Sequence, residues 1–426
     1  MNYRLMLKRL AGPLDPITRD WAVILGGNLA RLALGFFASI LIARSLGPDA
    51  FGIYAVLAAV VNLTGVFTDF GLTGAAVKRM AANWPHHPAG VRETGHALFW
   101  LRVGASGLTV AIVILAAGPL ASTILAVPQT LLHLALLGVV ATAMSGALSA
   151  IFQATGHFGR VNALSLTNAG LTTLLAAILV MADRLTLVSA LVVLGIGTSL
   201  ASFAVGYRLL PHPWRLSIPS LRTLHSEGRM LFDFGRWLWV AALFAILTAH
   251  LDVLLVNHWA LPATVGAYAL ALNLATKVDV VNHSLYTVLL PAASTLGGKG
   301  AVQRYIRRGA IRSVLISLPL LCLIPLARPF VLFFYGPAFA SAIGLFQQLL
   351  GVVLFDVFTT PFLLLAFSFN RPRLLALADV LRTITLVLLA VWLIPAIGPS
   401  GAILAKLGAK VAGAVLMLVM LMRAPR

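Results

Sequence analysis

Apolar residues in this chain gather in long stretches separated by short polar gaps. A helix of about 20 apolar residues crosses the hydrocarbon core of a bilayer, which is about 30 Å thick. Stretches of this length predict twelve spans, at about 21–44, 53–77, 96–118, 129–152, 161–182, 185–207, 236–257, 263–290, 310–334, 339–367, 374–394 and 400–422. Each must be helical, because lipid offers no partner to an unpaired backbone N–H or C=O group. We therefore expect an all-α polytopic membrane protein.

The positive charges lie in alternate gaps between the spans, which indicates the orientation of the chain. Of the 31 Lys and Arg residues, 22 fall at the two ends or in the even-numbered gaps, and only Arg44, Arg184 and Arg328 fall in the odd-numbered gaps. Cytoplasmic loops carry an excess of Lys and Arg. We therefore expect a multi-pass membrane protein with both termini in the cytoplasm. The net charge of +19 then belongs mostly to loops that face an anionic leaflet, and it implies no nucleic acid.

Composition and motifs exclude several classes of protein. Hydrophobic residues make up 60% of the chain and charged residues 10%, whereas soluble domains carry about 25% charge. Cys322 is the single cysteine, so we expect neither a disulfide framework nor a metal cluster. The sequence has no phosphate loop, no Rossmann glycine pattern and no nucleophile elbow. We expect a transporter without a cofactor, coupled to the membrane potential or to a cation gradient, and not an enzyme.

The chain divides near its middle at a polar gap that carries five arginines and three prolines. We expect a six-helix lobe at 1–210, a cytoplasmic linker at 211–232 and a second six-helix lobe at 233–426. A weak repeat supports two halves, because Gly52, Tyr54 and Ala55 recur 214 residues later as Gly266, Tyr268 and Ala269. Chance identity in a chain rich in Ala and Leu is the alternative explanation. Parallel repeats are related by a two-fold axis along the membrane normal, with a binding site near the midplane.

Four segments of the chain have a recognisable pattern: LGPDAFGIYAV (46–56), TDFGLTGAAVKR (68–79), LDVLLVNHWALPATVGAYALA (251–271) and IGPSGAILA (397–405). They resemble the polysaccharide transporter, or oligosaccharide flippase, family of the multidrug/oligosaccharidyl-lipid/polysaccharide (MOP) flippase superfamily. The likeness extends over nearly the whole chain. It implies two lobes around a central cavity, alternating access, and a lipid-linked oligosaccharide on undecaprenyl diphosphate as cargo. The resemblance also implies a place in the bacterial inner membrane and a role in the biosynthesis of surface polysaccharide, such as O-antigen, capsule or exopolysaccharide, with a polysaccharide polymerase as a candidate partner.

Six basic residues lie at span depth, where a charge costs about 3 kcal/mol or more. Arg31 is too deep for its side chain to reach the interface easily, so we expect it to line the cavity and to bind the diphosphate through its forked guanidinium. Arg102 and Lys277 are expected to support it, although Arg102 is close enough to the span end to snorkel. Lys406 and Lys410 share one helix face, where they either hold an anion together or neutralise Asp379 or Asp356.

Five acidic residues lie at comparable depth: Asp69, Asp252, Asp279, Asp356 and Asp379. Asp379 and Arg382, three residues apart, are expected to pair within one helix. Asp69 is expected to form a structural ion pair. Asp252 is a candidate for coupling transport to a cation, because burial raises the pKa of a carboxylate into the range where it can titrate. Asp356 remains either a coupling group or a member of an ion pair.

Three other functions compete with the flippase. A cation-coupled multidrug exporter of the same superfamily would need an acidic, aromatic-lined pocket, whereas bases outnumber acids here by six to five at span depth. A membrane polysaccharide polymerase would need a large outer loop or an acidic metal-binding domain. A structural scaffold would not retain so many charges at span depth.

The orientation predicts the outcome of reporter fusions. Fusions after residues 85, 220, 300 and 372 should report a cytoplasmic location, and fusions near 48, 122 and 260 an outer location, because the basic gaps stay inside. One reproducible reversal means that a span has been miscounted.

Overall fold

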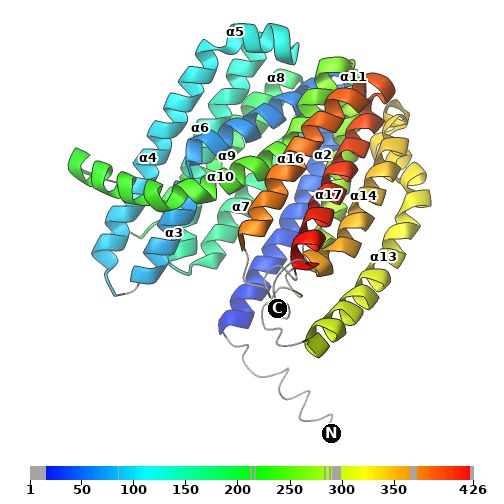
Figure 1. Cartoon of the computed structure of the whole chain (residues 1–426). Coiled ribbons are helices and arrows are strands. Elements are labelled where there is room, and N and C mark those ends of the chain that lie inside the picture. Colours follow the sequence, from blue (N-terminus) through cyan, green and yellow to red (C-terminus); the bar gives the residue numbers. More distant parts are fainter. Residues whose placement is uncertain are drawn as a thin grey trace, which may run out of the picture. The chain divides into compact units, whose positions relative to one another are not determined.

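The structure, a computed structural model, is helical through almost all of the part of the chain that it describes (Figure 1). It describes residues 16–84, 86–211, 214, 217–282, 285–286, 289, 299–364 and 372–422, with no side-chain detail for 16–23, 299–302, 306, 372–376, 418 and 420–422. The two ends, including most of the basic residues expected in the cytoplasm there, lie outside these ranges.

Long helices follow one another along the described chain. In order they are α2 (Pro16–Asp69), α3 (Leu72–Asn83), α4 (Pro88–Leu115), α5 (Ala117–Pro119), α6 (Gln129–Ala154), α7 (Phe158–Met181), α8 (Leu187–Ser189), α9 (Thr198–Leu209), α10 (Leu221–Trp259), α11 (Pro262–Val278), α13 (Lys299–Tyr335), α14 (Ala342–Leu363), α16 (Pro372–Ile397) and α17 (Pro399–Met422). Short π-helical turns at Leu120–Leu125 and Ala190–Gly197 and a 3-10 turn at Pro337–Phe339 complete the set.

Ten of the described helices are long and apolar enough to cross a membrane. The first of these, within α2, covers two predicted spans and is divided by a kink at Gly47, whose φ of 71° is not helical, followed by Pro48. The eighth predicted span begins with α11, a helix of 17 residues. The expectation of an all-α polytopic membrane protein is therefore confirmed.

Two segments differ from the prediction. The second predicted span ends early, because α2 stops at Asp69 and a new helix, α3, starts at Leu72. The predicted linker at 211–232 is helical from Leu221 onward and continues without a break into the seventh span as α10. Ser220 explains this start, since its hydroxyl accepts the backbone N–H of Thr223 at 3.1 Å, which is the bond of a helix N-cap.

Contacts group the chain into two compact units. The first takes its described residues from Met1–Leu41, Phe67–Ile112 and Leu134–Leu238, and the second from Ile42–Val66, Val113–His133 and Trp239–Arg426. In the second unit α17 packs against α16 and α14, and α14 packs against α11 and α13 (Figure 1). The division into lobes at 1–210 and 233–426 remains a prediction from the sequence.

Two segments of the second unit cross each other with almost no side chain between them. A Cβ atom on Gly52 would lie 2.1 Å from the carbonyl oxygen of Pro262, and one on Gly266 would lie 2.0 Å from that of Pro48. Pro48 and Gly52 are separated by four residues, as are Pro262 and Gly266, and the two pairs are 214 residues apart. Each copy of the repeat thus contacts the other in the same way, which supports a duplication over chance identity.

The glycine crossing predicts a selective effect of small substitutions. Gly52→Ala or Gly266→Ala should each cost about 1–3 kcal/mol of stability, because the added methyl group must push the backbones apart. The measurement is the thermal midpoint of the purified protein in detergent. Gly344→Ala on α14 is the matched control, since nothing lies within 4 Å of its Cβ position. Equal midpoints for the three variants would contradict close packing at the crossing.

Candidate functional site

A polar cavity of about 430 Å³ lies within the first unit. Four helices line it: α2, α6, α7 and α9. Its lining consists of small and hydroxylated residues with one cation: Arg31, Gly35, Ala38, Thr142, Ser145, Gly146, Ser149, Leu164, Ser165, Asn168, Ala169, Thr172 and Ser202. None of these lining residues is acidic. The cavity can therefore receive a polar ligand that carries negative charge.

The polar side chains of the cavity fall into two groups. The hydroxyls of Thr142, Ser145, Thr172 and Ser202 donate to backbone carbonyl oxygens and are satisfied within the protein. Within the described residues, Ser149, Ser165 and Asn168 have no side-chain hydrogen bond. Inside a membrane such groups need either water or a ligand. They supply hydroxyl and amide groups of the kind that bind sugars.

Arg31 carries the positive charge of the cavity. It lies about four turns into α2 and its side chain is exposed. It forms neither an ion pair nor a hydrogen bond with any residue of the described chain. Its five N–H donors are thus available to an anion. Arg31 thus lines a cavity of the first unit, while its place in a central cavity between two lobes and its contact with a diphosphate remain predictions.

Arg102 lies beside the same cavity but is engaged by a carboxylate. Its Nε is 3.3 Å from Oδ1 of Asp69, and the arginine side chain is only 12% exposed. The guanidinium covers Gly146 of the cavity wall, since a Cβ atom there would lie 2.8 Å from Nη1. Asp69 also accepts the backbone N–H of Thr73 at 3.3 Å and so binds the first turn of α3. This is an ion pair of the structural kind expected for Asp69, and Arg102 is half of it.

The second unit contains a carboxylate with no exposed surface. Asp252 on α10 accepts the phenol hydroxyl of Tyr268 at 2.5 Å and the ammonium of Lys406 at 2.6 Å on its Oδ2 atom. Its Oδ1 accepts the N–H of Val253 at 3.0 Å. Three helices thus meet at one ion pair, and both carboxylate oxygens are satisfied. The charge of Asp252 is thus neutralised within the protein by the ammonium of Lys406.

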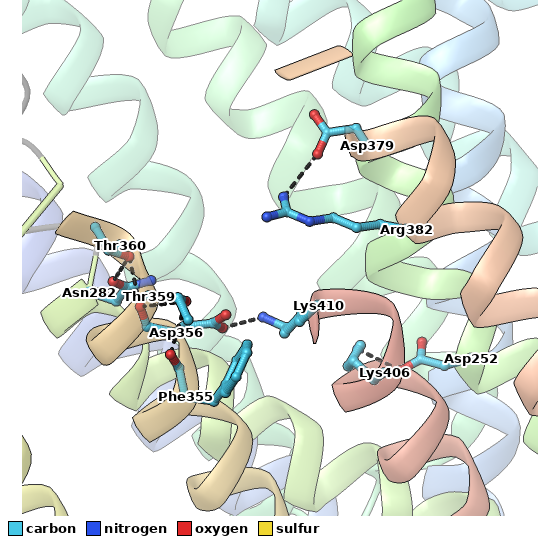
Figure 2. A network of polar contacts seen from close by, with 10 residues as sticks. All are labelled: Asp252, Asn282, Phe355, Asp356, Thr359, Thr360, Asp379, Arg382, Lys406 and Lys410. Atoms are coloured by element: carbon cyan, nitrogen blue, oxygen red, sulfur yellow. Dashed lines mark hydrogen bonds and ion pairs between the residues drawn. The ribbon is translucent and has the colours of Figure 1, made fainter. Parts of the chain in front are cut away.

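Two further ion pairs lie nearby in the same unit (Figure 2). Lys410, one turn after Lys406 on α17, points to Asp356 on α14 and pairs with its Oδ2 atom. Arg382 reaches back one turn along α16, where its Nη1 is 3.0 Å from Oδ1 of Asp379. The two lysines therefore have separate carboxylates, so no shared anion is needed to explain them. Of the two alternatives for Lys410, the structure shows neutralisation by Asp356.

Lys277 lies in the last turn of α11, in the second unit. Its ammonium donates to the side-chain oxygen of Asn273, one turn earlier on the same helix. It has no carboxylate partner among the described residues. The expectation that it supports Arg31 at a diphosphate remains a prediction.

Sequence reasoning based on charge missed the neutral polar groups. Ser165, Asn168 and Thr172 are spaced at three and four residues on α7, and Thr142, Ser145 and Ser149 at three and four on α6. Such spacing puts each set on one helix face. A stripe of hydroxyl and amide residues inside an apolar span was the signal that could have located the cavity. Tyr268 was noted only as part of the repeat, and nothing local in the sequence pairs it with Asp252.

Comparisons with known proteins agree with this fold and with the resemblance. Residues 41–344 match a family described as "Polysaccharide biosynthesis protein". No curated protein matches the chain. A structure of the lipid II flippase MurJ in an inward closed conformation superposes with a TM-score of 0.73 at 13% identity, over 95% of this chain and 88% of that one.

Multidrug transporters share the same fold. An inward-facing multidrug resistance MATE family transporter of the MOP superfamily gives a TM-score of 0.66 at 15% identity, over 92% of this chain and 94% of the other. The eukaryotic MATE transporter AtDTX14 gives 0.64 at 15% identity, over 96% and 97%. At these identities the matches show the fold and not the cargo.

The pairing of Asp252 with Lys406 predicts the effect of neutral substitutions. Asp252→Asn and Lys406→Met should each cost about 3–5 kcal/mol of stability, because each leaves one buried charge unpaired. The double variant should recover most of this loss. The measurement is the thermal midpoint of unfolding in detergent for the unaltered protein, the two single variants and the double variant.

The pair of Asp379 and Arg382 is the control for these variants. Its side chains are 44% and 25% exposed and lie in the first turns of the span, so Asp379→Asn should cost less stability than either single variant of the buried pair. A double variant of Asp252 and Lys406 that is no more stable than the single variants would contradict an isolated buried ion pair.

Proposed function

Because this chain belongs to the family of polysaccharide biosynthesis proteins, we propose that it is an inner-membrane flippase for a lipid-linked oligosaccharide. Its cargo carries sugars on a polyprenyl diphosphate, and it moves them from the cytoplasmic to the outer leaflet by alternating access. The diphosphate binds Arg31, the sugars contact the hydroxyl and amide groups of the cavity, and the prenyl chain stays in lipid. A polysaccharide polymerase is the natural receiver of the cargo.

The observation that carries this proposal is the free arginine in a hydroxyl-lined cavity. A guanidinium binds two oxygens of a phosphate group at once, and such charge-assisted bonds are about twice as strong as neutral ones. Ser149, Ser165 and Asn168 add hydroxyl and amide groups that apolar cargo would leave unpaired. The cavity thus matches both chemical parts of a sugar diphosphate.

The charge of the cargo bears on the energy source. A diphosphate that links two groups carries about two negative charges, and each charge that crosses a membrane potential of 100 mV gains or loses about 2.3 kcal/mol. When the cytoplasm is negative, outward movement of an anion is favourable. We propose that the membrane potential drives transport, since Lys406 and Lys410 already neutralise the carboxylates that a coupling cation would need.

The alternative is a cation-coupled multidrug exporter, which the structural likeness to MATE transporters favours. Cationic drugs bind where carboxylates and aromatic rings line the pocket. The cavity of the first unit instead presents an arginine, and no acidic or aromatic residue lines it. The charge of the cavity therefore favours the flippase.

Substitution of Arg31 tests the proposal. Arg31→Ala should lower surface polysaccharide at least about tenfold, because the charged hydrogen bonds to phosphate are lost. Arg31→Lys should restore it in part, since an ammonium is a point charge without the planar fork. The measurement is surface polysaccharide in a flippase-deleted strain that carries each variant, with the amount of protein in the membrane determined in parallel.

Arg44→Ala is the matched control, because Arg44 is an exposed arginine on the same helix that does not line the cavity. Full activity of Arg31→Ala at normal expression would remove this residue from the site. Efflux of a cationic dye by the unaltered protein, with no effect on polysaccharide, would support the exporter instead.

A further inference from the structure

The first part of α10, from Leu221 to Leu238, is a surface helix with two different sides. Its inner side holds it on the first unit. The carboxylate of Glu227 is buried and accepts Arg79 of α3 and Thr94 of α4, each at 2.9 Å. Leu231 is only 2% exposed and belongs to the hydrophobic core of the unit. These anchors are four residues apart, so they define one helix face.

The outer side of this segment carries a stripe of arginines. Arg222, Arg229 and Arg236 follow one another at intervals of seven residues, which places them along one face, and all three are exposed. None of them forms an ion pair with a residue of the described chain. Lys78 lies over the ring of Phe234 on the neighbouring face, with its ammonium 4.1 Å from the ring centre. Asp233 is the exposed acidic residue of the segment.

A second exposed stripe on the same segment is apolar. Met230, Phe234 and Trp237 are spaced at four and three residues and are 43%, 44% and 72% exposed. The helix then runs on without a break into an apolar stretch long enough to span a membrane. The segment is therefore held at the level where the bilayer meets water, and there Trp and Arg are the residues typical of an interface.

We propose that Leu221–Leu238 of α10 binds anionic phospholipids of the adjoining leaflet. The three arginines contact headgroup phosphates, and the Met230, Phe234 and Trp237 side chains enter the boundary of the acyl chains. A helix with a basic face and a neighbouring apolar face binds a membrane surface in this way, through charge and apolar area together. This surface is separate from the cargo cavity, and the proposal holds whichever molecule the protein transports.

A fluorescent reporter on the outer side tests the proposal in the full-length protein. Ser226→Cys, in a Cys322→Ser background, is labelled with an environment-sensitive dye, since Ser226 is exposed between Arg222 and Arg229. The protein is placed in nanodiscs of phosphatidylcholine with increasing phosphatidylglycerol. Emission should shift to the blue as the anionic lipid increases, and high salt should weaken the shift.

Removal of the charges should weaken lipid binding in a graded way. The triple variant Arg222→Gln, Arg229→Gln and Arg236→Gln should lower the apparent affinity for phosphatidylglycerol roughly a hundredfold, about fivefold for each arginine. The corresponding triple lysine variant should keep most of the response, because it keeps the charge. Elution as a single species in size-exclusion chromatography shows that each variant is folded.

A second triple variant controls for net charge. Arg304, Arg307 and Arg308 are exposed on α13, and their replacement by Gln removes the same charge from another place. This variant should respond like the unaltered protein. An equal loss in both glutamine variants, an unchanged response in the α10 variant, or the same shift in neutral nanodiscs would overturn the proposal.

Discussion

A charged side chain inside a membrane-spanning helix loses its water, and this loss governs where the polar groups of the chain lie. An unpaired charge at this depth costs about 3 kcal/mol or more. In the second unit, the carboxylates of Asp252, Asp356 and Asp379 each have a lysine or arginine within ion-pair distance. The charges of these three carboxylates are therefore neutralised locally, whereas Lys277 in the same unit has no carboxylate partner among the described residues. Two of the pairs join separate helices, so they also select how those helices align.

The first unit follows the same rule with one exception. Arg102 pairs with Asp69, and Arg79 pairs with Glu227, whereas Arg31 has no counter-charge in the described chain. It opens instead onto a cavity lined with hydroxyl and amide groups. A cation can persist there because water or a ligand can reach it. What matters for function is thus whether a cation at span depth is paired with a carboxylate. A count of charges at that depth does not separate paired from unpaired cations.

Local patterns predicted much of the fold and little of the site. Hydropathy located the spans, and spacing alone was enough for Asp379 and Arg382, which pair one turn apart on one helix. The bond from Lys406 to Asp252 joins residues 154 positions apart, and it depends on how two helices cross, which spacing does not encode. Asn168 carries no charge, so a reading of the charges at span depth does not single it out. The segment predicted as a linker is helical from Leu221, and its many charged residues masked the N-cap signal of Ser220.

The crossing of Pro48 and Gly52 with Pro262 and Gly266 has a consequence for the origin of the chain. The glycine of each segment packs against the proline carbonyl of the other segment. The contact is therefore isologous, like that of a symmetric dimer. In an ancestor of half this length, one Pro-Xaa-Xaa-Xaa-Gly segment would have supplied both sides. Two such subunits could associate in the same orientation before any gene fusion. A chain fused from two such subunits would keep their interface as part of its interior.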